Sequence, residues 1–258
     1  MTGTSETRLG GTRPATDRAP PAATLADVTG QASSPSRGRF ITIEGPEGAG
    51  KTTQAARLEA LLTDRGVPVV RTREPGGTVL GERIRELLLD PGASRIDPLA
   101  DAFLFNAARH QLVTELIEPA LAGGTTVICA RFADSTRAYQ GYGSGLSLED
   151  LEQLETIATA GLEPDLTILL DVPVEVGLAR KAPHDQTRFE TAYDLAFHRR
   201  VRNGFLAMAV AEPSRFVVLD GTAPADSVAE RIERSVARVL HEVRAGGKPN
   251  RPAARIQR

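Results

Sequence analysis

The stretch that decides the fold reads Gly45-Pro46-Glu47-Gly48-Ala49-Gly50-Lys51-Thr52-Thr53. It fits the phosphate-binding pattern G-x-x-x-x-G-K-[ST]. The apolar residues 40–43 before it predict a buried strand, and residues 53–62 after it predict an amphipathic helix. A strand, a glycine-rich turn and a helix N-terminus direct backbone N–H groups at one point, where they can bind phosphate. The sequence therefore predicts a nucleoside triphosphate site.

Residues 45–53, called the phosphate loop below, are expected to cradle the phosphates of ATP. Lys51 is expected to reach the β and γ phosphates as a catalytic cation, and the Thr52 hydroxyl is expected to bind Mg²⁺. A plain glycine-rich turn is the alternative interpretation. The strand and helix on either side favour the phosphate site.

Composition excludes several classes of protein. The chain has 258 residues, a formal net charge of −2 and 41% hydrophobic residues, and it has no apolar run long enough to span a membrane. We therefore expect neither a membrane nor a nucleic-acid partner. Cys129 is the only cysteine, so an internal disulfide is impossible and a cytoplasmic location is expected.

The chain divides into a domain and two tails. Residues 1–37 are rich in small and polar residues without apolar periodicity, which predicts a disordered N-terminal tail. Residues 38–243 are expected to form one domain. Residues 244–258 carry five basic residues among Gly and Pro and are expected to form a basic C-terminal tail.

Within the domain, predicted strands alternate with predicted helices. The strands are expected at 40–43, 67–71, 125–130, 166–172 and 216–220. Helices are expected at 78–89, from 147 and over 224–243, and one or two helices within 97–121, with Pro119 as a local interruption. Helix 78–89 is expected to bury Leu80, Ile84, Leu87 and Leu88 on one face. Continuous apolar strands separated by helices predict an α/β fold, a three-layer parallel sheet with helices on both faces, of the P-loop NTPase type.

Polar clusters follow the predicted strand ends, where ligands of such sheets bind. Arg73 leads into a Pro-Gly-Gly turn, and Arg131 is placed to hold a phosphate that the loop does not hold. Phe105 and Arg109 share a helix face and could stack on and hydrogen-bond a nucleobase, although a core Phe beside a solvated Arg is the alternative. The basic residues 180–188, called the lid segment below, are a candidate lid over the triphosphate.

Several segments together resemble bacterial thymidylate kinases, namely 44–53, 72–78, 105–109, 135–141, 164–172 and 188–190. The resemblance covers about residues 38–242. It implies transfer of the γ-phosphoryl group of ATP to dTMP, giving dTDP and ADP for dTTP biosynthesis. It also implies Mg²⁺ as the metal and a homodimer as the assembly.

The resemblance implies a role for each site residue. Glu47 would face the acceptor sugar, Arg131 would clamp the acceptor phosphate, and Arg73 would belong to the substrate site. The base would be held by Phe105, Arg109, Thr136 and Gln140, and the deoxyribose by Tyr139. Gly48 stands where one subgroup has an arginine, so the catalytic basic charge would come from the lid segment, through Arg180, Lys181 and Arg188. Residues 221–224 resemble the turn that borders adenine.

Four positions depart from the family pattern. Acids are usual where this chain has Ala130, Thr187, Arg199 and Ala207. The loss at Ala130 removes a carboxylate expected beside the metal and the loop lysine, and Asp134 or Asp171 are candidates to replace it. Two alternatives therefore stand beside a working dTMP kinase: a kinase for a modified or different pyrimidine monophosphate, and a catalytically weak nucleotide-binding paralogue.

Overall fold

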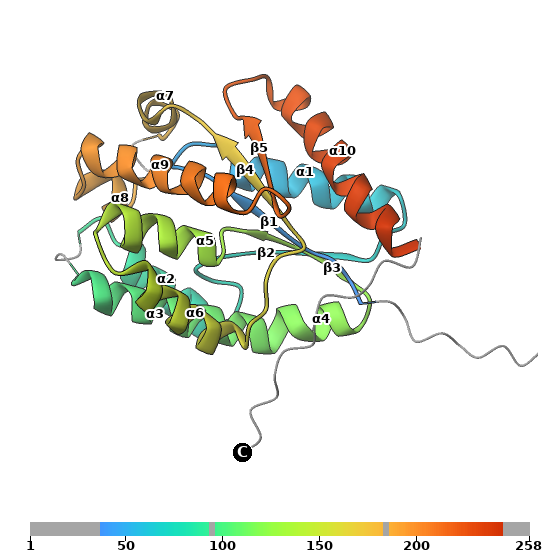
Figure 1. The fold of residues 1–258 in the computed structure, drawn as a ribbon, viewed down its shortest axis with the longest axis horizontal. Helices are drawn as coiled ribbons and strands as arrows, with labels where there is room; N and C mark the ends of the chain where they lie inside the picture. The colour runs from blue at the N-terminus through green and yellow to red at the C-terminus, as the bar shows by residue number, and fades with distance from the viewer. Residues whose placement is uncertain (1–36, 93–95, 183–185, 245–258) are drawn as a thin grey trace, which may run out of the picture. The chain divides into compact units, whose positions relative to one another are not determined.

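The computed structural model describes residues 37–92, 96–182 and 186–244 (Figure 1). The predicted disordered and basic tails lie outside the described residues except for Arg37 and Arg244, and so does part of the lid segment, residues 183–185.

A five-stranded parallel sheet forms the centre of the domain. Its strands are β1 (Phe40–Glu44), β2 (Val69–Arg73), β3 (Thr126–Ala130), β4 (Leu166–Asp171) and β5 (Phe216–Asp220). The order across the sheet is β2-β3-β1-β4-β5, and every neighbouring pair is parallel. The strand β1 thus lies in the middle, and the phosphate loop leaves its carboxyl end.

Helices cover both faces of this sheet (Figure 1). One face carries α1 (Lys51–Asp64) and α10 (Ala225–Arg244), whose Leu58, Leu62 and Ile232 pack on Ile41 and Ile43 of β1. The other helical elements are α2 (Val79–Leu89), α3 (Pro98–Leu112), η2 (Val113–Ile117), α4 (Glu118–Ala122), α5 (Ala133–Thr136), η3 (Arg137–Gly143), α6 (Leu148–Thr159), α7 (Val174–Ala179), α8 (Arg188–Thr191) and α9 (Leu195–Ala211).

The alternation of side chains along each strand explains the two cores. In β3, Ile128 and Ala130 pack with α1, whereas Val127 and Cys129 pack on the opposite face with η2 and α4. Because both sets are apolar, the strand reads as a continuous apolar run. The predicted three-layer α/β architecture is confirmed.

Two predicted elements differ in detail from the structure. The second strand begins at Val69 rather than at residue 67, because the N–H of Val67 donates to the Leu62 carbonyl and closes the end of α1. The predicted apolar face of α2 is wrong for two residues, since Leu80 and Leu87 are exposed. The helix instead buries Gly81, Ile84 and Leu88, because Gly81 lies against the carbonyl of Gly76.

The predicted helical region 97–121 is one continuous path with a change of winding. The helix α3 passes into the π-helical turn η2 and then into α4, where Pro119 lies in the first turn. Because the path is continuous, Pro119 lacks an N–H that would otherwise bond one turn back, and the wider π-helical turn lies directly before it. The predicted interruption is therefore a change of helix type at residues 113–117 rather than a break at Pro119.

Candidate active site

One cavity opens at the carboxyl ends of β1, β2 and β3. Its lining includes nine residues that the sequence assigns to the phosphate loop or to the acceptor site, namely Glu47, Lys51, Thr52, Phe105, Arg109, Arg131, Thr136, Tyr139 and Gln140. These residues come from the phosphate loop, from α3 and from the segment after β3. Parallel strands place their carboxyl ends at one edge of a sheet, which explains why segments far apart in sequence meet here.

The phosphate loop connects β1 directly to α1. Lys51 is the first residue of α1, and its ammonium donates to the carbonyls of Gly45 at 2.9 Å and Pro46 at 2.7 Å. The side chain of Thr52 follows on the first turn, is exposed and lines the cavity. Burial, together with the charge of Arg131, lowers the pKa of Lys51 to about 7.

The loop packs backbone to backbone against α7. A Cβ atom on Gly48 would lie 1.9 Å from the carbonyl oxygen of Gly177, and one on Gly177 would lie 2.2 Å from the carbonyl oxygen of Glu47. Gly48 also has φ +65°, a conformation that L-residues rarely adopt. The position of Gly48 therefore has no room for a side chain of any kind.

Glu47, Arg131 and Tyr139 form a closed triangle of hydrogen bonds. Arg131 donates to Glu47 Oε1 at 2.8 Å and to the Tyr139 hydroxyl at 3.1 Å, and that hydroxyl donates to the same Glu47 oxygen at 2.7 Å. Burial alone would raise the pKa of Glu47, but Arg131, Lys51 and Lys181 together hold it well below its usual range. Glu47 is therefore ionised, and it holds the Arg131 guanidinium in place at the cavity.

The backbone of Arg131 is in the left-handed region, with φ 72°. A non-glycine residue there costs about 1 kcal/mol or more, and such strain collects at functional sites. The N–H of Arg131 donates to the Ile43 carbonyl of the neighbouring strand at 3.0 Å, which holds the strained residue in place.

Arg109 is fully buried in the wall of the cavity. It donates to Glu74 at 2.9 Å, to Asn106 at 3.0 Å and to the Thr136 hydroxyl at 2.9 Å. The alternative of a solvated arginine is therefore wrong. Burial raises the pKa of Glu74 to about 7, although Arg109 opposes the shift. Phe105 lies one turn earlier on α3 and lines the same wall.

The lid segment splits into two parts with different positions. Arg180 donates to the Gly221 carbonyl at 2.9 Å, at the turn that resembles an adenine border. Lys181 lines the cavity and lies 2.8 Å from Glu190 and 3.8 Å from Glu47. Arg180 also lies 3.5 Å from the Gly48 carbonyl oxygen, so both cations lie beside the phosphate loop, but of the two only Lys181 lines the cavity.

The structure contradicts the predicted places of Arg188 and Arg73. Arg188 is buried, donates to the Leu88 carbonyl and to Asp101, and is not among the residues that line the cavity. Arg73 is half exposed and pairs with Glu82 outside the cavity. Neither side chain faces the phosphate loop, because each has a carboxylate partner elsewhere.

Arg85 is a cavity residue that the sequence analysis missed. It lies on α2, lines the cavity and donates to the Pro75 carbonyl at 2.9 Å. Its only signal in the sequence is that α2 starts directly after the Pro-Gly-Gly turn, so its first two turns lie near the strand ends.

Asp134 and Asp171, the two candidates to replace a carboxylate at Ala130, each form an ion pair with an arginine outside the cavity. Asp134 pairs with Arg215 at 2.7 Å, and Asp171 pairs with Arg202 at 2.6 Å. Neither lines the cavity, so the expected replacement is wrong.

A different carboxylate lies at this edge of the sheet, at the end of β1. Glu44 is fully buried and accepts from the Phe132 N–H at 2.6 Å and the Ser135 hydroxyl at 2.7 Å. Burial, with the charge of Asp134, raises the pKa of Glu44 to about 7. The sequence did not single out this residue, because a single glutamate at a strand end carries no pattern.

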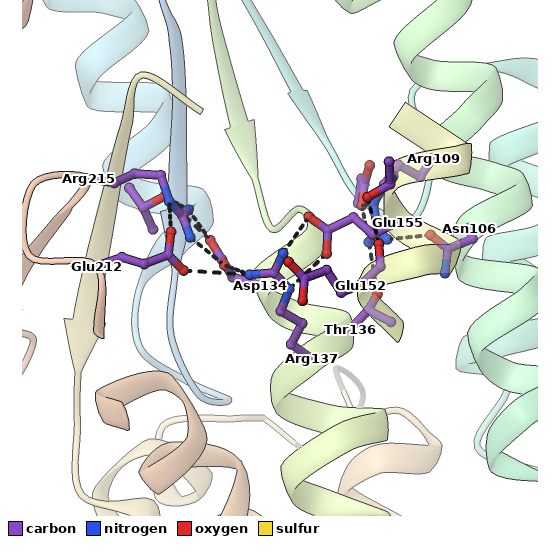
Figure 2. A network of polar contacts seen from close by, with 12 residues as sticks. Asn106, Arg109, Asp134, Thr136, Arg137, Glu152, Glu155, Glu212 and Arg215 are labelled. Atoms are coloured by element: carbon purple, nitrogen blue, oxygen red, sulfur yellow. Dashed lines mark hydrogen bonds and ion pairs between the residues drawn. The ribbon is translucent and has the colours of Figure 1, made fainter. Parts of the chain in front are cut away.

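Figure 2 shows a charged network around Asp134, Arg137 and Arg215, together with the cavity residues Arg109 and Thr136. Arg215 donates to Asp134 and to Glu212, while Arg137 donates to Glu155 at 2.9 Å and lies 3.6 Å from Glu212. Arg137 is the first residue of η3, the π-helical turn that carries Tyr139 and Gln140. The network therefore fixes the start of the turn that presents these two residues to the cavity.

Within residues 37–92, 96–182 and 186–244, no group of three or more His, Cys, Asp or Glu side chains is arranged to hold a metal ion. In the same ranges, no helix combines the length and the apolar character needed to cross a membrane.

Comparison with known proteins agrees with the geometry. The family model described as thymidylate kinase matches residues 43–232. The thymidylate kinase of Deinococcus radiodurans is 56% identical over 207 residues, which are 80% of this chain and 100% of that protein. The thymidylate kinase of Thermomicrobium roseum is 54% identical over 203 residues, 78% of this chain and 95% of that protein.

A solved structure shows the same relationship. The crystal structure of thymidylate kinase from Ehrlichia chaffeensis superposes with a TM-score of 0.62 at 36% identity, covering 79% of this chain and 99% of that one. The phosphate loop, the parallel sheet and these matches lead to one conclusion. This chain belongs to the thymidylate kinase family.

Proposed function

We propose that this protein transfers the γ-phosphoryl group of ATP to dTMP, giving dTDP and ADP, a step of dTTP synthesis. The observation that carries the proposal is one cavity lined by the phosphate loop, by a second cation, Arg131, and by the buried Arg109 with the half-buried Phe105. Such a cavity suits two nucleotides that meet through their phosphates. The relatives described above carry the name of this activity, which does not favour the alternative acceptors or a weak paralogue.

The residues explain how two anions are brought together. Lys51 serves the donor phosphates, and Arg131 serves the acceptor phosphate. Arg85 and Lys181 add positive charge to the same cavity. Phosphoryl transfer needs little covalent help from the protein, so positioning and charge neutralisation carry the catalysis.

Mg²⁺ fits this site as a metal that arrives with ATP. The Thr52 hydroxyl is exposed on the first turn of α1 and lines the cavity beside Lys51. One hydroxyl with phosphate oxygens and water is a usual environment for Mg²⁺ in phosphate-loop enzymes. When bound there, the ion would neutralise charge on the phosphates. Thr52→Ala is expected to raise the Mg²⁺ concentration needed for half-maximal activity.

The acceptor base is assigned to the wall made by α3 and η3. Phe105 offers a ring face, and Arg109 and Thr136 offer polar groups held in fixed positions by their mutual bond. Tyr139 lies between this wall and the phosphate loop, where a deoxyribose would join base and phosphate.

An ADP-release assay tests the proposal. The purified chain is mixed with ATP and Mg²⁺ and with dTMP, dUMP, dCMP or no acceptor, and Lys51→Ala serves as the inactive control. Rapid turnover with dTMP is expected. Turnover only with another pyrimidine monophosphate, or no turnover despite measurable ATP binding, would contradict the proposal.

We also propose that the chain forms a homodimer through α2 and α3. These helices pack on each other and expose Val79, Leu87, Leu99 and Phe103, an apolar set for which a second copy is a suitable partner. Light scattering is expected to give twice the chain mass. Phe103→Glu is expected to shift the protein to monomer, and a monomeric wild type would contradict the proposal.

A further inference from the structure

We propose that Asp101, held by Arg188, is a positioning residue that fixes the Gln140 amide with its oxygen towards the acceptor base. Through this link the site would select pyrimidine monophosphates whose ring carries an N–H at position 3, as thymine and uracil do. The inference rests on the proposed function, because it assigns selectivity to the same acceptor site.

Three buried side chains from distant segments make the link. Gln140 of η3 donates through its amide nitrogen to Asp101 Oδ2 at 3.0 Å, and Arg188 of α8 donates to Asp101 Oδ1. All three side chains are almost completely buried, with exposed fractions of 1–2%. Of the three, only Gln140 lines the cavity. Asp101 thus contacts the cavity lining through Gln140, while Arg188 also lies over the ring of the lining residue Phe189, 4.6 Å from its centroid.

The charge on Asp101 determines which end of the amide it holds. An ionised carboxylate only accepts hydrogen bonds, so it selects the amide nitrogen and rejects the amide oxygen. Burial raises the pKa of Asp101, whereas the hydrogen bonds from Arg188 and Gln140 favour its charged form. Arg188 thus stabilises the ionised form of Asp101, which can only accept a hydrogen bond from the Gln140 amide nitrogen.

The orientation of the amide has a consequence for the base. With its nitrogen held by Asp101, Gln140 can offer its carbonyl oxygen to the cavity, and no hydrogen bond to that oxygen is found among the described residues. Thymine and uracil present a donor at ring position 3, whereas cytosine presents an acceptor there. A site built to pair a donor rejects an acceptor strongly, because both groups would be left unpaired.

The Asp101→Asn variant tests the link, because its new amide can donate to the Gln140 oxygen and allow that side chain to turn. The expected result is a fall of about tenfold in kcat/KM for dTMP, mainly through KM. The KM for ATP should stay unchanged, and the ratio of kcat/KM for dTMP to that for dCMP should also fall. Asp101→Glu keeps an acceptor-only group and should retain most of the wild-type ratio.

The controls separate this inference from the proposed function. Asp226→Asn makes the same chemical change at an exposed position of α10 and should leave the ratio unchanged. An unchanged ratio in a folded Asp101→Asn variant, or an equal loss in Asp101→Glu, would overturn the inference. Failure of the wild type to phosphorylate dTMP would instead overturn the proposed function.

A measurement on the wild-type protein decides the matter even where the variant does not fold. Nitrogen-15 spectra, with the Gln140 signals assigned from Gln140→Leu, report solvent exchange of its side-chain amide protons. At least one of these protons should be strongly protected, as expected of a buried bond to Asp101. Rapid exchange of both protons would overturn the inference.

Discussion

Arg131 Nη2 lies 2.8 Å from Glu47 Oε1, so a cation from the end of β3 and a carboxylate from the phosphate loop share one contact. The Tyr139 hydroxyl donates to the same oxygen and limits the rotation of both side chains. The residue assigned to the acceptor phosphate is therefore held by a residue of the loop assigned to the donor phosphates.

Arg131→Lys is expected to lower kcat/KM for dTMP by about a hundredfold, because lysine cannot reproduce the planar set of donors. Steady-state kinetics with dTMP and with ATP measure the effect. Tyr139→Phe removes one hydroxyl and should cost less, about tenfold. A larger effect of Tyr139→Phe than of Arg131→Lys would contradict the assigned roles.

The buried Glu44 is expected to make stability depend on pH. Its pKa is about 7 in the fold against an ordinary value of 4.5. Below pH 4.5 the Glu44 carboxyl is protonated in both the folded and the unfolded chain, so its titration does not change the free energy of unfolding. As the pH rises from 4.5 to 7 the unfolded chain ionises first, so the free energy of unfolding falls, by about 3 kcal/mol in all.

Urea unfolding of wild type and Glu44→Gln at pH 5, 6, 7 and 8 measures this effect. The stability advantage of the Gln variant should grow up to about pH 7 and then stay constant. Taking the difference between the two proteins cancels the other titrating groups. Parallel pH curves would show that Glu44 is not responsible.

Gly48→Ala is expected to destabilise the protein more than Gly66→Ala. Both glycines have positive φ, +65° and +70°, so both variants carry the same backbone strain of about 1–2 kcal/mol. A Cβ atom on Gly48 would collide with the carbonyl oxygen of Gly177, whereas a Cβ atom on Gly66 meets nothing within 4 Å. Thermal unfolding should show a clearly lower Tm for Gly48→Ala. Equal Tm values would mean that the loop and α7 separate at little cost.

Asp134→Ala is expected to cost about 3 to 5 kcal/mol of folding stability, because it leaves the largely buried Arg215 without its main partner. Chemical unfolding measures the change. Glu175→Gln is the control, since it breaks the ion pair of Glu175 with Arg199 at an exposed position and should leave stability nearly unchanged. Similar effects of both variants would argue against a structural role of the network in Figure 2.

The sheet and the phosphate loop could be predicted from the sequence, because both rest on local patterns. Apolar runs mark each strand, and the loop motif lies between a strand and a helix. Arg131 was also found, because it directly follows a strand. Glu44 and Arg85 were missed, since nothing near them in sequence distinguishes them from other charged residues.

The two arginines placed wrongly show the limit of such reasoning. The family resemblance and the basic lid segment assigned Arg188 to the catalytic charge, but its partner Asp101 lies 87 residues away in the sequence. Arg73 likewise pairs with Glu82, one helix turn beyond the loop that suggested its role. An arginine in a charged segment goes to whichever carboxylate the fold brings near, and only the tertiary structure identifies that carboxylate.

The contact between Gly48 and Gly177 also limits the mutational paths open to this chain. A lineage that starts from this chain could not gain an arginine at position 48 by one substitution, because the carbonyl of Gly177 occupies the place of its Cβ. The loop and α7 would first have to move apart. Until then an arginine at position 48 would lower the stability of the fold without adding to catalysis. In this backbone the two glycines thus exclude a basic side chain at position 48 for as long as the loop and α7 stay in contact.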